Sequence, residues 1–117
     1  MQRDLDAEVL KQMAREDGLT GIANCRWLDF QFAQEFERAQ RFEHPLTVAL
    51  LDIDYFKNVN DRFSHQTGDA VLRTAARLLR DSCRSVDVLG RYGGEEFMLV
   101  LVETPCESAL PLKAPRR

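Results

Sequence analysis

The sequence lacks the features that define several large classes of protein. No apolar run approaches the roughly 18 residues that a transmembrane helix needs, and residues 1–12 contain no apolar core of a secretion signal. The cysteines, Cys25, Cys83 and Cys106, are odd in number and widely spaced, so they form neither a CxxC motif nor a disulfide framework. We therefore expect a cytoplasmic chain with no membrane segment and no disulfides.

The sequence also has no excess of basic residues and lacks the common catalytic motifs. Lys and Arg number 16 against 19 Asp and Glu, which gives a formal net charge of −3. A protein that coats DNA or RNA needs a basic surface, so we expect no nucleic-acid partner. Neither a GxxxxGK phosphate loop nor a Ser-His-Asp or Cys-His set is present. The 117 residues, 44% of them hydrophobic, have the composition of one globular domain.

Hydrophobic periodicity divides the chain into predicted helices and strands. A first amphipathic helix, residues 3–15, carries a narrow apolar stripe that suits either a partner helix of an upstream domain or a frayed end. The elements that follow are a helix from Asn24 to the His44-Pro45 step, a strand at 47–53, helices at 55–63 and 67–83, and strands at 86–92 and 95–102. Three prolines after Val102 predict an irregular tail over residues 103–117 and an incomplete sheet.

Three local patterns refine this prediction. One face of the long helix should be buried, and it consists of Leu28, Phe32, Phe36, Ala39 and Phe42. The unbroken apolar run at 47–53 is typical of a central strand covered on both faces. Gly93-Gly94 predicts a two-residue hairpin loop with positive φ angles. A lone His65 is interpreted as a capping or core residue rather than a ligand.

Acidic residues gather where the strand at 47–53 ends. Asp52 and Asp54 share a strand face unless the strand ends between them, and a buried carboxylate requires a cation, a basic partner or a helix N-terminus. The hairpin adds Glu95 and Glu96 beside them. Carboxylates of this kind suit Mg²⁺, which binds one or two of them together with substrate phosphates. A structural salt bridge is the alternative.

The residues that follow this strand suit a nucleotide. Phe56 and Lys57 come directly after its carboxyl end, where backbone amides and an ammonium group can meet phosphate. Asn60 and Asp69 offer an amide and a carboxylate, a pair that can satisfy the hydrogen-bonding edge of guanine. Turn formation and helix capping are the alternative roles for these two residues.

Together these residues resemble the GGDEF domain of diguanylate cyclases. The resemblance rests on four ordered motifs, which are Asp17-Gly18-Leu19-Thr20-Gly21 with Asn24; residues 52–57 with Asn60-Asp61; His65-Gln66-Thr67-Gly68-Asp69; and Arg91-Tyr92-Gly93-Gly94-Glu95-Glu96-Phe97. It implies an α/β (α+β), ferredoxin-like or polymerase-palm-like fold with a mainly antiparallel central sheet flanked by helices. Residues 17–102 would be the domain, truncated before the family's last helix and closing strand, and residues 1–16 a signalling helix from an upstream sensor domain.

The resemblance also implies a reaction and a set of roles. Two GTP molecules condense to cyclic di-GMP with release of two pyrophosphates, in a two-fold homodimer with Mg²⁺ or Mn²⁺. Asp52, Glu95 and the Ile53 carbonyl would hold the metal, and Glu96 would assist ionisation of the attacking hydroxyl. By the same resemblance Asn60 and Asp69 read guanine, while Phe56 and Lys57 meet the phosphates. The alternatives are a domain that binds GTP or cyclic di-GMP without turnover, and an inert fragment.

A second ligand site is implied upstream of the hairpin. The family has a product-inhibition site with the pattern Arg-x-x-Asp, and Arg84-Ser85-Val86-Asp87 stands at the corresponding offset from Gly93. An arginine can clasp guanine or phosphate and an aspartate can accept from guanine. The alternative is a solvated helix end.

Overall fold

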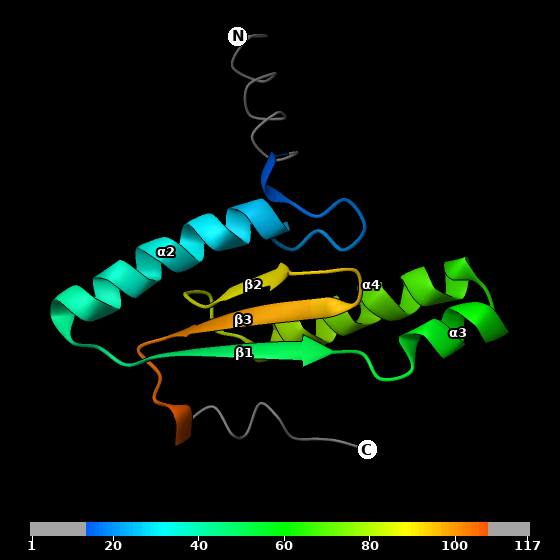
Figure 1. The fold of residues 1–117 in the computed structure, drawn as a ribbon. Coiled ribbons are helices and arrows are strands. Elements are labelled where there is room, and N and C mark those ends of the chain that lie inside the picture. The colour runs from blue at the N-terminus through cyan, green and yellow to red at the C-terminus, as the bar shows by residue number, and fades with distance from the viewer. Residues whose placement is uncertain (1–13, 108–117) are drawn as a thin grey trace, which may run out of the picture.

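The computed structural model describes residues 14–107, which form a three-stranded antiparallel sheet with helices on both faces (Figure 1). The elements in order are α2 (Cys25–Phe42), β1 (Leu46–Asp52), α3 (Phe56–Arg62), α4 (His65–Ser82), β2 (Val88–Arg91) and β3 (Glu96–Val102). The expected α+β architecture is confirmed. Most of the helix predicted at 3–15 and the last ten residues of the predicted tail lie outside the described residues. Within residues 14–107, no helix is both long and apolar enough to cross a membrane.

Strand β3 is the centre of the fold. The strand order is β1-β3-β2, and β3 pairs antiparallel with both neighbours, for example Leu51 with Phe97 and Val88 with Val100. The residues from Phe97 to Leu101 are all buried. Because successive residues of a strand face opposite sides, β3 supplies the core to two helical layers at once.

Each face of the sheet is covered by one long helix. On one face Leu28 of α2 is fully buried and packs with Met98 and Val100. On the other face Leu79 of α4 and Cys83, the residue that follows the helix, pack against Leu99 and Leu101. A side chain at Gly90 would lie 2.9 Å from Leu28, so the glycine of β2 allows α2 to approach the sheet closely.

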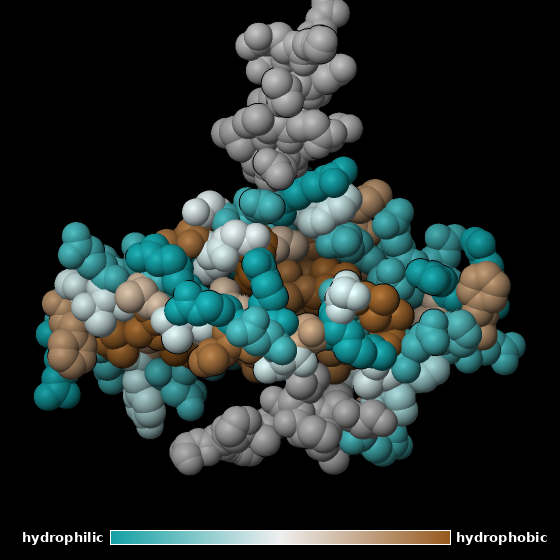
Figure 2. Space-filling model, turned by 180° about the vertical axis from the view of Figure 1, so that it is seen from behind, coloured by the Kyte–Doolittle hydropathy of each residue, from teal (hydrophilic) through white to brown (hydrophobic). Residues whose placement is uncertain are grey.

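The apolar pattern at 47–53 predicts a central strand covered on both faces, and this prediction is wrong. The edge position that an incomplete sheet implies for this strand is confirmed. β1 lies at the edge of the sheet, and Val48 and Leu50 are 40% and 67% exposed. Its other face, with Ala49 and Leu51, packs towards α4. The run is apolar throughout, so periodicity could not show which face lacks a covering helix. In the view from behind, hydrophobic patches reach the surface between polar regions (Figure 2).

The predicted buried face of α2 is only partly buried. Leu28 is inaccessible and Phe32 is partly covered, but Phe36 and Phe42 are 48% and 56% exposed. The second half of α2 extends past the beginning of β2, as Figure 1 shows, so the three-stranded sheet offers those side chains little to pack against. Asn24 caps the helix as predicted, because its side chain accepts a hydrogen bond from the Trp27 N–H at 2.8 Å.

Two smaller predictions are also wrong. The hairpin loop is not two residues long, because residues 92–95 separate β2 from β3, and neither Gly93 nor Gly94 adopts a positive φ. His65 is neither a cap nor a core residue. It is the exposed first residue of α4, and the preceding Ser64 caps the helix by accepting from the Thr67 N–H at 3.0 Å.

Within residues 14–107 no strand pairs with the outer edge of β1, and this predicts self-association. Ala23 closes the edge of β2 through hydrogen bonds with Leu89 and Arg91. In β1, the Ile53 N–H donates to the Glu95 carbonyl, so alternation directs the backbone groups of Val48 and Leu50 to the free edge. An uncovered apolar edge is a template for pairing with a second copy. We expect a mass above that of the monomer in light scattering at tens of micromolar.

Substitution of Leu50 tests whether β1 carries this association. Leu50→Lys should shift the chain towards monomer, because a charge on an edge strand opposes pairing. Leu78→Lys is the matched control, since Leu78 is 63% exposed but belongs to α4 and not to the edge strand. A monodisperse monomer of the unsubstituted chain, or an equal effect of both variants, would contradict the prediction.

Candidate functional site

The acidic cluster forms where β1 ends beside the start of β3. Asp52 is the last residue of β1 and lies opposite Glu96, and the Ile53 N–H donates to the Glu95 carbonyl at 3.2 Å. β1 therefore ends between Asp52 and Asp54, and Asp54 lies in the turn before α3. The structure brings Asp52, Glu95 and Glu96 together, as the spacing of the motifs predicts.

These carboxylates repel one another. Partial desolvation and the nearby carboxylate of Asp52 raise the pKa of Glu95, and Glu96 acts in the same direction. No ion pair among residues 14–107 neutralises any of the three acids. An acidic pair of this kind fits a divalent cation.

The donor set at this end of the sheet is small. Within the described part of the chain, no group of three or more His, Cys, Asp or Glu side chains is arranged to hold a metal ion. The side-chain oxygen donors near one another here are those of Asp52, Glu95 and Glu96. That set suits Mg²⁺, which completes its shell with water and substrate phosphates.

Gly93 makes room for the side chain of Glu96. A Cβ at position 93 would lie 2.5 Å from Glu96 Oε1, so the carboxylate folds back over the glycine. The hairpin therefore uses this glycine for close approach of a side chain and not for a left-handed backbone. The Gly93-Gly94 pair in the sequence predicted a hairpin glycine here, but for its positive φ angle and not for the space it leaves to Glu96.

The contact between α3 and α4 contains an unsatisfied acceptor. Asn60 packs against Gly68, where a Cβ would lie 1.7 Å from Asn60 Oδ1. That oxygen is buried and has no hydrogen-bond partner among the described residues. Asp69 follows Gly68 directly. A buried acceptor without a partner destabilises a fold by about 1–3 kcal/mol, so this oxygen is a cost to stability, and only the amide nitrogen of Asn60 is left to meet a ligand.

Phe56 and Lys57 differ in their surroundings. The Phe56 side chain is 9% exposed and belongs to the core with Leu72 and Ala76, so only its backbone is available to a ligand. Lys57 is exposed in the first turn of α3. The structure thus leaves one ammonium group near the end of β1.

Arg91 connects the acidic hairpin to the turn at residues 17–21. Its Nη1 donates to both carboxylate oxygens of Asp17 at 3.2 Å, and its Nη2 donates to the Gly94 carbonyl at 2.7 Å. Asp17 also accepts from the Thr20 N–H and hydroxyl, at 2.9 and 2.7 Å. Burial works to raise the pKa of Asp17, but the Thr20 hydrogen bonds and the charge of Arg91 hold it below the usual value. Motif spacing gave no indication of this bridge.

A second polar site lies at the other end of the sheet. Arg84 Nε and Nη2 donate to the two oxygens of Asp87 at 3.3 and 3.0 Å, and the Val102 N–H donates to Asp87 at 3.1 Å. The Asp87 side chain is only 3% exposed. Although burial opposes it, hydrogen bonding by Arg84 keeps the pKa of Asp87 below its ordinary value. We call this pair the Arg84–Asp87 clasp.

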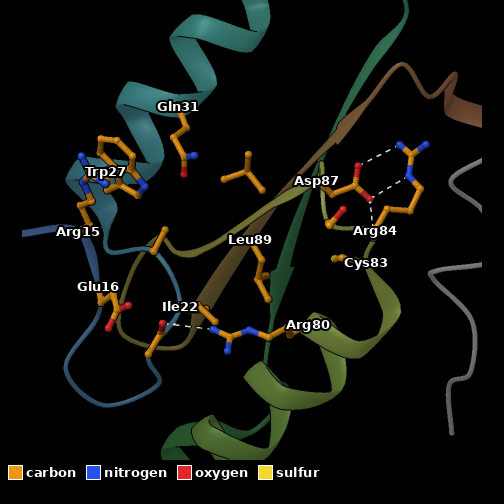
Figure 3. Close-up of a pocket in the computed structure, with 14 residues that line it drawn as sticks. Arg15, Glu16, Ile22, Trp27, Gln31, Arg80, Cys83, Arg84, Asp87 and Leu89 are labelled. Atoms are coloured by element: carbon orange, nitrogen blue, oxygen red, sulfur yellow. Dashed lines mark hydrogen bonds and ion pairs between the residues drawn. The ribbon is translucent and has the colours of Figure 1, made fainter. Parts of the chain in front are cut away.

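A cavity of about 700 Å³ opens beside the clasp (Figure 3). Trp27 lines it at one end and Arg80 at another, and the guanidinium of Arg15 lies 4.2 Å from the centre of the Trp27 ring. Aromatic and guanidinium groups of this kind suit a planar, anionic ligand. The sequence pattern predicts a ligand site at Arg84 and Asp87 but gives no signal for Trp27 and Arg80. These two residues line the cavity only because of how α2 and α4 are placed relative to β2.

Comparisons with known proteins agree with this arrangement. The family model described as "Diguanylate cyclase, GGDEF domain" matches residues 14–114. "Diguanylate cyclase DosC" of Escherichia coli (strain K12) is 42% identical over 101 residues, which are 86% of this chain and 22% of that protein. The chain spans 22–33% of the length of the curated relatives it matches.

Two solved structures are similar in both sequence and fold. The GGDEF domain of DgcB from Caulobacter crescentus, in complex with c-di-GMP, has a TM-score of 0.78 at 35% identity, covering 80% of this chain and 55% of that one. The active GGEEF domain of a diguanylate cyclase from Vibrio cholerae has a TM-score of 0.73 at 43% identity, covering 76% and 57%.

Substitution of Asp17 tests the bridge made by Arg91. Asp17→Asn should lower the free energy of unfolding by about 1–2 kcal/mol at neutral pH, because a half-buried, charge-assisted network is lost. The folded-state pKa of Asp17 is depressed, so its stabilisation is present above the unfolded value and disappears as the pH falls through the folded value. Urea unfolding at neutral and strongly acidic pH measures the difference. Asp29→Asn, on the exposed side of α2, is the control, and equal stability of the two variants would contradict the prediction.

Proposed function

Because the chain belongs to the GGDEF domain family of diguanylate cyclases, we propose that it condenses two GTP molecules into cyclic di-GMP with release of two pyrophosphates. The convergence of Asp52 and Glu95 at the end of β1 is the observation that most supports this proposal. Two domains, each with one GTP, would face each other across a two-fold axis. Each 3′-hydroxyl then attacks the α-phosphate of the opposite nucleotide, and pyrophosphate leaves.

The acidic end of the sheet would bind the triphosphate through a divalent cation. Asp52, Glu95 and the Ile53 carbonyl would hold Mg²⁺ or Mn²⁺, which when bound neutralises phosphate charge. Glu96, folded over Gly93, would assist ionisation of the attacking hydroxyl or support the metal site. Lys57 and the backbone at Phe56 would contact phosphate oxygens.

Asn60 of α3 and Asp69 of α4 would read the base. Guanine presents N1–H and N2–H donors beside an O6 acceptor, and the Asp69 carboxylate together with the Asn60 amide matches that pattern. The close approach of Asn60 to Gly68, the residue before Asp69, supports one shared site for these two side chains, with the Asn60 amide nitrogen as donor to O6. Adenine lacks the N1–H donor, so this pair favours GTP over ATP.

The Arg84–Asp87 clasp would bind the product. Cyclic di-GMP carries guanine edges and phosphates, and the clasp offers a guanidinium and a buried carboxylate beside a large cavity. Because the clasp lies at the opposite end of β3 from Asp52 and Glu95, about 20 Å away by the usual strand rise, product binding would regulate the enzyme without occupying the GTP site.

A second function is binding of GTP or cyclic di-GMP without turnover. One observation favours it, because Lys57 is the only basic residue in the segments 52–61 and 92–97 that form the acidic end. Incubation with GTP and Mg²⁺ followed by chromatography of the nucleotides distinguishes the two. Product formation supports the cyclase, and bound but unconverted GTP supports the binding domain.

Substitution of Glu95 tests the metal–triphosphate site. Glu95→Gln should weaken Mg²⁺-dependent GTP binding at least about tenfold in calorimetry, because the second carboxylate donor is lost. The wild-type affinity should also fall as the pH is lowered, since the raised pKa of Glu95 means that protonation removes its charge early. Glu37→Gln, exposed on α2, is the control. Binding that is indifferent to Glu95→Gln and to chelation of Mg²⁺ would overturn the assignment.

Substitution of Asn60 separates a ligand role from a structural one. Asn60→Ala should reduce the preference for GTP over ATP while leaving thermal stability unchanged or higher, because it removes a buried, unsatisfied acceptor. A structural asparagine would give the opposite result, a lower melting temperature with unaltered nucleotide preference. Calorimetry with both nucleotides and thermal unfolding measure the two properties.

A further inference from the structure

One nitrogen of Arg84, Nη2, lies within hydrogen-bonding distance of more acceptors than it has hydrogens. Nη2 donates to Asp87 Oδ1 at 3.0 Å, to Thr104 Oγ1 at 2.8 Å, and to the Val102 carbonyl. An arginine Nη carries two hydrogens, so three acceptors share two N–H groups. One of these contacts is therefore easy to exchange.

A guanidinium has two pairs of N–H groups, or forks, that can each bind a planar acceptor through two hydrogen bonds. Which fork is already used indicates the contact that a ligand must replace. The Nε and Nη2 fork of Arg84 is taken by the carboxylate of Asp87. Bidentate binding of a guanine edge or a phosphate therefore requires the other fork, made by Nη1 and the second hydrogen of Nη2. That hydrogen is directed at Thr104 and the Val102 carbonyl.

Thr104 is held in the orientation of an acceptor. Its hydroxyl donates to the Val102 carbonyl at 2.9 Å, which leaves a lone pair for Arg84. Its own carbonyl accepts from the Thr47 hydroxyl at 2.6 Å, which fixes the backbone of Thr104 beside the start of β1. The hydroxyl thus competes with any ligand that approaches Arg84.

We propose that Thr104 is a positioning residue that competes with the ligand for Arg84 and so sets the affinity of the Arg84–Asp87 clasp. This inference rests on the proposed binding of cyclic di-GMP at the clasp. Without ligand, Thr104 keeps Arg84 folded onto the end of β3. With ligand, the outer fork of Arg84 turns to the nucleotide and the Thr104 hydroxyl is released.

Removal of the Thr104 hydroxyl tests the competition. Thr104→Val should bind cyclic di-GMP about threefold to tenfold more tightly in calorimetry, because the ligand no longer displaces a hydrogen bond. Thr104→Ser keeps the hydroxyl and should bind like the wild type. Thr74→Val, an exposed threonine on α4, is the control for the substitution itself and should have no effect.

Stability provides a second readout. Thr104→Val should be less stable than the wild type in urea unfolding, since contacts to Arg84 and Val102 are lost, while its ligand affinity rises. A purely structural role predicts that stability and affinity fall together, and this result, or unchanged affinity, would overturn the inference alone. Arg84→Ala should abolish binding in every background. Failure of all variants to bind cyclic di-GMP would overturn the product site as well, whereas GTP binding at Asp52 and Glu95 would be unaffected.

Discussion

The arrangement of the acidic end depends on the contacts of Arg91. Its guanidinium holds the carboxylate of Asp17 on one side and the carbonyl of Gly94 on the other, so the turn before α2 and the loop that carries Glu95 are fixed to each other. The backbone of Arg91 adds a hydrogen bond to Ala23. The loop between β2 and β3 has four residues and two glycines, so this anchor limits the freedom that would otherwise move Glu95 away from Asp52.

The order of elements and the acidic cluster could be predicted from the sequence, because both depend on local patterns. Asp52 ends an apolar strand and Glu95 follows a glycine pair, and antiparallel pairing then brings them together. Periodicity alone did not show the exposure of Leu50 and Phe36, since a periodic pattern does not reveal where a covering element ends; only the incompleteness of the predicted sheet pointed to it. The role of Gly93 was missed for a related reason, because its contact with Glu96 depends on a side-chain conformation.

The two polar sites are connected through one strand. β3 begins with Glu96 in the acidic cluster and ends with Val102, whose N–H and carbonyl contact Asp87 and Arg84. Its middle residues are buried between α2 and α4 and cannot shift without disturbing both layers. A change at the Arg84–Asp87 clasp is therefore more easily transmitted through the side-chain hydrogen bonds of Thr104 and Thr47 at the strand's end than along the packed strand itself.

Different degrees of burial suit the two arginine–aspartate pairs of this domain to different roles. The side chains of Arg91 and Asp17 are 20% and 18% exposed, so both charges have lost much of their water and separating them would leave each poorly solvated. In the clasp the Arg84 side chain is 56% exposed while that of Asp87 is 3% exposed. Arg84 can exchange one acceptor for another at little loss of solvation, whereas Asp87 must remain hydrogen-bonded. The first pair is consequently suited to fixing the fold, and the second to exchanging an internal contact for a ligand.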